Sequence, residues 1–88
     1  MTIGLIKERK NPPDKRVPFS PLQVEEIEQR FPGVQVIVEE SPIRCFKDKE
    51  YADYRIPVES DMSKADVLMG IKEVPLEDLI EGKTYMFF

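Results

Sequence analysis

The 88-residue sequence contains no histidine and no tryptophan, and it has only one cysteine. Without an imidazole, these residues cannot form a self-contained Ser/His/Asp or Cys/His catalytic centre, nor a zinc site of the usual histidine and cysteine type. The single cysteine, Cys45, cannot form an internal disulfide bond. Because the first residues also lack the pattern of a secretory signal peptide, the expected location is the reducing cytoplasm.

Long apolar runs and glycine-rich motifs are missing too. No run approaches the roughly 20 apolar residues that a membrane span needs, so no membrane association is expected. The four glycines form neither a Gly-x-Gly-x-x-Gly nor a Gly-x-x-x-x-Gly-Lys motif. These residues therefore give no basis for dinucleotide binding or for P-loop chemistry.

The charges are distributed unevenly along the chain. The formal net charge of −4 argues against a general nucleic-acid binder. Residues 1–16 contain five basic and two acidic residues, a local charge of +3, so the remaining residues carry −7. Such a basic segment favours a localised site for a carboxylate or a phosphate. The alternative is a solvated basic loop without a ligand. The glutamate pairs at 25–26 and 39–40 lack further carboxylates at metal-ligand spacing, so we interpret them as solvated faces and expect no metal site.

Two apolar runs end in the same pair of charged residues. Residues 3–6 are followed by Lys7 and Glu8, and residues 67–71 are followed by Lys72 and Glu73. Uninterrupted runs of this kind are typical of strands that are buried on both faces of a parallel sheet. Because ligands bind at the carboxyl ends of such strands, both runs place a lysine and a glutamate where a small molecule would bind.

The other elements alternate between helix and strand. A Ser-x-x-Gln capping box at residues 20–23 predicts a helix that ends at the Pro-Gly pair 32–33, with Val24, Ile27 and Phe31 on its buried face. The elements expected after it are a strand at 34–38, a short helix at 48–54, a short edge strand at 56–58, a helical turn at 61–64, a strand at 67–71, a short helix after Pro75 carrying Leu76, Leu79 and Ile80, and a strand at 84–88.

This alternation predicts an α/β fold, namely a Rossmann-like (flavodoxin-like) parallel sheet with flanking helices that lacks the dinucleotide fingerprint. The aromatic residues Phe31, Phe46, Tyr51 and Tyr54 are interpreted as core and helix-packing residues. The final strand stops without a turn or a polar tail, an arrangement that natural domains avoid. We therefore expect residues 1–88 to be the front piece of a longer protein and the sheet to be truncated.

Arg16, Lys72 and Glu73 are the candidate site residues. Arg16 lies in a proline-bounded loop, where its guanidinium could bind a carboxylate through two hydrogen bonds. The alternative for Arg16 is a surface pair with Asp14 or Glu8. Lys72 follows a buried strand, and partial burial lowers the pKa of a lysine, which makes the amine available for proton transfer. The alternative for Lys72 is a lysine that simply ends the hydrophobic run. Glu73 would point to the opposite side of the strand or cap the next turn.

Taken together, these motifs resemble the N-terminal domain of the alanine dehydrogenase and pyridine nucleotide transhydrogenase superfamily. Within it, the chain is most similar to the lysine-forming saccharopine dehydrogenases, the lysine-ketoglutarate reductase branch. The resemblance spans essentially the whole chain. It is carried by residues 3–8, by 15–21 and by 38–42 with Phe46 and Tyr51, and its most specific stretch is residues 69–75 followed by 83–88.

The resemblance implies a two-domain oxidoreductase that oxidises an amino acid to an oxo acid by hydride transfer to NAD or NADP. Residues 1–88 would be its substrate-side N-terminal domain, while the missing second domain would bind the dinucleotide and the family's catalytic histidine would follow Phe88. Arg16 matches the family's carboxylate-binding arginine, and Lys72 matches its lysine for substrate binding and proton transfer. Glu73 is a weaker match, to an acidic neighbour in the saccharopine branch.

The resemblance also implies a small amino or oxo acid as the ligand, a homo-oligomeric full-length enzyme, and no activity of the 88-residue piece alone. Two other functions stay open on the residues themselves. One is a non-enzymatic ligand-binding or regulatory domain that holds an anionic metabolite at the same edge. The other is a docking module that presents Phe87 and Phe88 to a partner.

Overall fold

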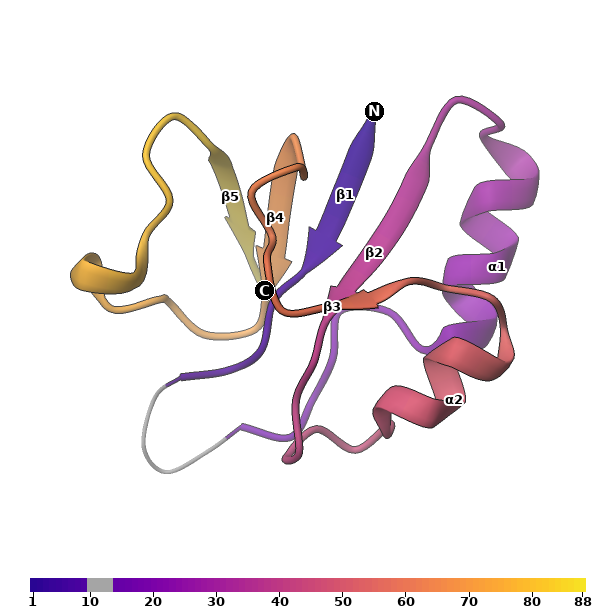
Figure 1. Cartoon of the computed structure of the whole chain (residues 1–88), viewed down its shortest axis with the longest axis horizontal. Coiled ribbons are helices and arrows are strands. Elements are labelled where there is room, and N and C mark those ends of the chain that lie inside the picture. Colours follow the sequence, from indigo (N-terminus) through magenta and orange to yellow (C-terminus); the bar gives the residue numbers. More distant parts are fainter. Residues whose placement is uncertain (10–13) are drawn as a thin grey trace.

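The computed structural model describes residues 1–9 and 14–88, and it contains one five-stranded parallel sheet (Figure 1). The strand order is β3-β2-β1-β4-β5, and every neighbouring pair is parallel. This arrangement confirms the predicted α/β fold. The strands are β1 (Thr2–Leu5), β2 (Gln35–Glu39), β3 (Val58–Glu59), β4 (Val67–Gly70) and β5 (Thr84–Phe87).

The sheet reverses its direction of growth between β1 and β4. From β1 the chain moves outward to β2 and β3, and it then returns to the other side of β1 to form β4 and β5. With its two-residue edge strand β3, the sheet has the order 3-2-1-4-5, which is the Rossmann order without its sixth strand. Without β3, the order is that of a flavodoxin-like sheet. The point between the carboxyl ends of β1 and β4 is therefore the topological switch point, where open α/β sheets bind ligands.

Helix α1 (Pro21–Arg30) begins with the predicted capping box. The Ser20 hydroxyl accepts a hydrogen bond from the Gln23 backbone N–H at 3.3 Å, and the Gln23 side chain accepts one from the Ser20 N–H at 2.8 Å. Val24 is fully buried, as expected, but Phe31 is 58% exposed. Phe31 is the C-cap, with φ −127° and ψ 80°, so its side chain leaves the helical stripe that the spacing predicted.

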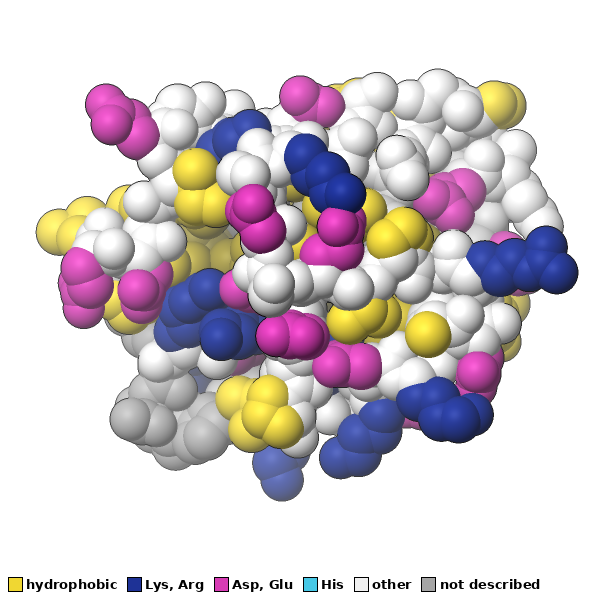
Figure 2. All heavy atoms as spheres, in the orientation of Figure 1, with side chains coloured by type: hydrophobic (Ala, Val, Ile, Leu, Met, Phe, Trp, Pro, Cys, Tyr) yellow, Lys and Arg dark blue, Asp and Glu magenta, His cyan; other side chains and the backbone are white. Residues whose placement is uncertain are grey.

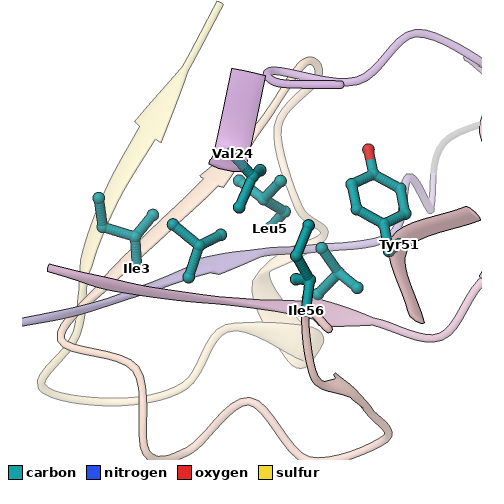
Figure 3. Packing of buried hydrophobic residues seen from close by; sticks show 7 residues of the cluster. Ile3, Leu5, Val24, Tyr51 and Ile56 are labelled. Carbon is teal, nitrogen blue, oxygen red and sulfur yellow. The ribbon is translucent and has the colours of Figure 1, made fainter. Parts of the chain in front are cut away.

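The hydrophobic core has two parts, one on each face of the sheet. Helices α1 and α2 (Asp48–Asp53) both cover one face, where Val24 of α1 reaches toward Leu5 of β1 (Figures 1 and 3). Side chains alternate between the faces along each strand, so Ile37 of β2 belongs to the other cluster. The helix-side cluster contains Ile3, Leu5, Val24, Val36, Val38, Tyr51 and Ile56. The second cluster contains Ile6, Ile37, Met62, Ala65, Leu68 and Val74.

Gly4 shows how closely the second face is packed. A Cβ at this position would lie 2.9 Å from both the Ala65 Cβ and the Leu68 Cδ2. Glycine is therefore required in β1 for packing against the segment that precedes β4 and against β4 itself.

Some expected helical positions are wrong. The segment after Pro75 forms only the 3-10 turn η1 (Leu76–Asp78), and Leu76 is 85% exposed. A short helix is stable when its apolar stripe is buried, and the Leu76 side chain faces solvent here. Tyr54 is also mainly at the surface, at 40% exposure, because the helical backbone ends at Asp53. The helical turn expected at 61–64 is a non-helical turn.

Hydrophobic side chains also reach the surface near the β5 edge. Met86 and Phe88 are 47% and 63% exposed, and the rings of Tyr85 and Phe87 stack with centroids 5.8 Å apart. Figure 2 shows hydrophobic side chains on the η1 side of the molecule, while acidic and basic side chains are interspersed over the rest of that face. Within the described residues, no helix has the length and apolar character needed to cross a bilayer.

Candidate functional site

A buried glutamate joins the carboxyl ends of β1 and β4. Glu8 is only 9% exposed, and its Oε2 and Oε1 accept hydrogen bonds from the backbone N–H groups of Ile71 (3.0 Å) and Lys72 (2.8 Å). Glu8 follows β1, and the two donors follow β4. This carboxylate therefore holds together the two loops that flank the topological switch point.

A second buried glutamate joins β1 to β2 in a similar way. Glu39 is 5% exposed and accepts hydrogen bonds from the Lys7 backbone N–H (2.9 Å) and from Nη2 of Arg9 (2.7 Å). The interpretation of Glu39 as part of a solvated face is therefore wrong, because its carboxylate binds the backbone at the end of β1. Arg9 is further oriented by a 3.1 Å hydrogen bond from its Nη1 to the Lys7 carbonyl.

Arg16 lies in the loop between β1 and α1, and its guanidinium binds Asp14. Its Nε donates to Oδ1 at 3.0 Å and its Nη2 donates to Oδ2 at 2.6 Å, while the Arg16 backbone N–H also donates to Oδ1 at 2.9 Å. These hydrogen bonds lower the pKa of Asp14 to about 2, and the same pair raises the pKa of Arg16. Asp14 contacts only one side of the guanidinium, whose side chain is 69% exposed, so the group can bind a second carboxylate through its remaining donors.

Lys72 follows β4, at the same edge of the sheet as this ion pair. Its positive charge is one of the causes that lower the pKa of Asp14, after the larger effects of Arg16. The charge of Glu8 in turn contributes to the raised pKa of Arg16. Arg16 and Lys72 thus lie on loops at the same edge of the sheet, and the Lys72 backbone N–H binds Glu8, but within the described residues no hydrogen bond or ion pair joins Lys72 to Asp14 or Arg16. These four residues provide two acidic and two basic side chains from three separated stretches of sequence.

The surroundings of Lys72 and Glu73 differ from the expectation. Both side chains are exposed, so the predicted partial burial of Lys72 is wrong in this chain. The physical reason is that no layer of described residues covers this edge of the sheet. Glu73 follows Lys72 directly, but within residues 1–9 and 14–88 no hydrogen bond or ion pair joins it to Arg16, Asp14 or Lys72.

The site is an open rim of charges rather than a closed pocket. A pocket of about 160 Å³ does exist nearby, lined by the Arg9–Glu39 pair together with Asp78 and Tyr85, but neither Arg16 nor Lys72 lines it. An open edge that carries charged side chains of both signs is suited to a small charged ligand held between this edge and a further protein surface.

The described residues do not fit a bound dinucleotide. Such a site needs a short glycine-rich turn that leads directly from a strand into a helix. Here β1 ends at Leu5 and α1 begins at Pro21, and Gly4 is used for core packing. We therefore assign no part of a dinucleotide site to this chain.

Sequence reasoning missed the two carboxylates of the site. Glu8 was noted as a strand-end charge and as a possible surface partner of Arg16, and Asp14 only as such a partner; of these pairs, the structure shows the one with Asp14. The usable signal was the repeated strand-end pair, because two parallel neighbours that both end in charged residues place these residues at one edge. Which carboxylate binds which partner depends on the loop conformation.

Comparison with known proteins gives one family. Residues 4–88 match the model described as alanine dehydrogenase/PNT, N-terminal domain. The chain is 34% identical over 86 residues to the mitochondrial alpha-aminoadipic semialdehyde synthase of Bos taurus, and 26% identical over 90 residues to the alpha-aminoadipic semialdehyde synthase of Arabidopsis thaliana. Each match covers 98% of this chain but only 9% and 8% of the respective relative.

Proposed function

The chain belongs to the alanine dehydrogenase/PNT N-terminal domain family, and from that premise we propose that it is the substrate-binding domain of a longer NAD(P)-dependent amino-acid dehydrogenase. Its ligand would be an amino acid or the corresponding oxo acid. The observation that carries the proposal is that Arg16, held by Asp14, and Lys72, whose backbone is held by Glu8, lie on the loops that follow β1 and β4 at the switch point of the sheet. The relatives named alpha-aminoadipic semialdehyde synthase support a substrate of the saccharopine or lysine type.

In this proposal Arg16 binds the carboxylate of the substrate. The Nε and Nη2 atoms of its guanidinium already bind Asp14, and the exposed N–H donors that remain can bind the substrate carboxylate. The Asp14 contact fixes the plane of the guanidinium before substrate arrives. Because the Arg16 side chain is already oriented, it loses less conformational entropy when the substrate binds.

Lys72 is proposed to act at the reacting nitrogen or oxygen. As an ammonium, it can donate a hydrogen bond to the oxo oxygen, and as a neutral amine, it can accept a proton from the substrate's ammonium group. Glu73 is proposed as a further contact to the substrate, from the adjacent position. Hydride transfer would require a second domain, so the 88-residue chain alone is expected to be inactive.

The first experiment measures turnover of the full-length protein. Saccharopine with NAD or NADP, L-lysine with 2-oxoglutarate and NAD(P)H, and L-alanine with NAD or NADP are the three substrate sets. Lys72→Met is expected to lower kcat by about 100-fold or more, the range typical of a lost acid-base group, without loss of folding. Lys49→Met is the matched control, because Lys49 pairs with Asp53 on α2 away from the rim. Wild-type-like rates in Lys72→Met would contradict the catalytic role.

A second experiment separates the roles of the two cations. Arg16→Lys keeps the positive charge but loses the planar fork, so we expect a raised KM for the substrate carboxylate with a smaller change in kcat. An unchanged KM would argue against carboxylate binding by Arg16.

The alternative is a non-enzymatic domain that holds an anionic metabolite, and the open charged rim is the observation in its favour. A calorimetric titration of the 88-residue chain with NADH should show no binding if the proposal is right, and a clear isotherm would contradict it. If the full-length protein binds 2-oxoglutarate but turns over none of the three substrate sets, the alternative is favoured.

A cytoplasmic location and homo-oligomeric assembly stay predictions.

A further inference from the structure

The buried carboxylate of Glu8 accepts a hydrogen bond from the backbone N–H of Lys72 itself. We propose that Glu8 is a positioning residue, which sets where the Lys72 ammonium lies relative to Asp14 and Arg16. The inference rests on the proposed function of Lys72. The sequence patterns place Glu8 only at a strand end and as a possible partner of Arg16, and the comparisons give it no role.

The geometry is that of a carboxylate bound by two consecutive backbone N–H groups. The donor–acceptor distances are 3.0 Å from Ile71 and 2.8 Å from Lys72, and each oxygen of Glu8 serves one donor. Hydrogen bonds to an ionised acceptor are among the stronger ones in proteins, and Glu8 is 9% exposed, so water competes little for them. The carboxylate thus fixes the backbone directly after β4.

Gly70 is part of the same arrangement. A Cβ on Gly70 would lie 3.2 Å from Oε2 of Glu8 and 3.1 Å from Cγ1 of Ile6. The absence of a side chain at the last residue of β4 leaves the space that the Glu8 carboxylate occupies. Two positions 62 residues apart in sequence therefore combine to hold the loop that carries Lys72.

The backbone of Lys72 determines where its ammonium group can reach, because the exposed side chain makes no hydrogen bond or ion pair with the described residues that would fix the ammonium elsewhere. A flexible exposed lysine samples a volume that is centred on its own Cα, so its distance from Asp14 is set mainly by where that Cα lies. The charge of Glu8 also acts on Arg16, the other cation of the rim. One carboxylate therefore influences both groups that are proposed to bind substrate.

Glutamine cannot replace Glu8 in this role. It has one acceptor oxygen and an NH₂ group, which is a donor and would face a second backbone donor. Glu8→Gln is nearly isosteric, yet it should release one of the two amides. Glu39 offers a control, because it is also buried and also binds a strand-end backbone N–H, that of Lys7 (2.9 Å), which is not among the residues proposed to bind substrate; unlike Glu8, it also binds Nη2 of Arg9 (2.7 Å).

The test is a double-mutant cycle on binding of 2-oxoglutarate to the full-length protein, measured by calorimetry. Glu8→Gln should weaken binding about 10-fold when Lys72 is present and less than about 2-fold in the Lys72→Met background. Glu39→Gln should lower the melting temperature comparably, but its effect on binding should be the same in both backgrounds. Equal effects of Glu8→Gln in both backgrounds would overturn the inference, because a merely structural residue acts independently of Lys72.

Hydrogen exchange supplies a readout that needs no substrate. In Glu8→Gln, the amides of Ile71 and Lys72 should exchange about 10-fold faster or more, whereas Glu39→Gln should accelerate the Lys7 amide instead. Unchanged exchange at Ile71 and Lys72 would overturn the inference even if the protein is an active dehydrogenase. If exchange responds as expected but the wild-type protein binds no 2-oxoglutarate and has no turnover, the proposed function fails and the role of Glu8 toward substrate fails with it.

Discussion

Tyr51 connects the helix-side core to the segment that leads from the Arg16 loop into α1. Its side chain is fully buried, and its hydroxyl donates a 2.7 Å hydrogen bond to the backbone carbonyl of Phe19 (Figure 3 shows the hydroxyl pointing away from the cluster). The Arg44 guanidinium lies over the ring, 4.8 Å from its centroid. Tyr51→Phe keeps the ring packing and this cation–π contact but removes the hydroxyl, so it isolates the hydrogen bond.

The expected cost follows from the group that is left behind. Without the hydroxyl, the Phe19 carbonyl loses this donor, and a buried hydrogen bond of this kind contributes roughly 1–2 kcal/mol when one partner is removed. For a domain of this size, 1 kcal/mol corresponds to a change of about 4–8 °C in the melting temperature. Urea unfolding at neutral pH should therefore show a lower midpoint with an unchanged slope.

The pH dependence gives an independent check on the same residue. Burial raises the pKa of Tyr51 from its ordinary value of 10.0 to about 12. Because the folded state holds this proton more tightly than the unfolded state does, the contribution is complete below pH 10 and is lost as the pH rises toward about 12. Wild-type protein should therefore lose more stability than Tyr51→Phe over this interval.

Tyr54→Phe is the control for both measurements, since Tyr54 is 40% exposed and should change stability by less than about 0.5 kcal/mol. The reasoning would be refuted if Tyr51→Phe matched wild type in its urea midpoint. It would equally be refuted if the two proteins had the same loss of stability at alkaline pH.

Two further predictions concern the backbone and the acid range. Arg55 has a φ of 62° just after α2, a left-handed position that favours glycine, so Arg55→Gly should stabilise the protein by about 1 kcal/mol and raise the melting temperature, while Arg55→Ala should not. Asp14 has a pKa of about 2, below its ordinary 3.8, so its contribution to stability is present above pH 4 and is lost as the pH falls toward 2. Urea unfolding at pH 5 and pH 2.5 should show a smaller acid loss for Asp14→Asn than for wild type, and equal losses would contradict the Arg16 pair.

The fold could be predicted because its signals are local. The capping box at Ser20, the buried Val24 and the apolar strands each depend on a few neighbouring residues. Phe31 and Leu76 were misjudged for a different reason. Their side chains depend on where a helix ends and on whether a second surface covers it, and neither is encoded in the spacing of apolar residues.

The candidate site was predictable at the level of topology. Parallel strands put their carboxyl ends at one edge, so the position of the Arg16 and Lys72 loops at the same edge followed from the alternation of strands and helices, while the binding roles of the two residues stay predictions. The partner that each carboxylate binds did not follow from the order of elements. Both Asp14 and Glu8 were possible partners of Arg16, and the structure divides them: Asp14 binds the guanidinium, and Glu8 binds the backbone after β4.

This division of the two carboxylates explains how an exposed rim can still be ordered. Arg16 and Lys72 have long side chains, and holding such side chains in place costs conformational entropy. Asp14 holds the Arg16 guanidinium through its Nε and Nη2, so part of the side-chain entropy of Arg16 is lost on folding rather than on ligand binding, while Glu8 fixes the backbone that carries Lys72. The same carboxylates balance the two cations, which keeps the rim near neutrality. An amino acid, whose carboxylate and ammonium also balance, can bind there without leaving an uncompensated charge when a further surface closes over it.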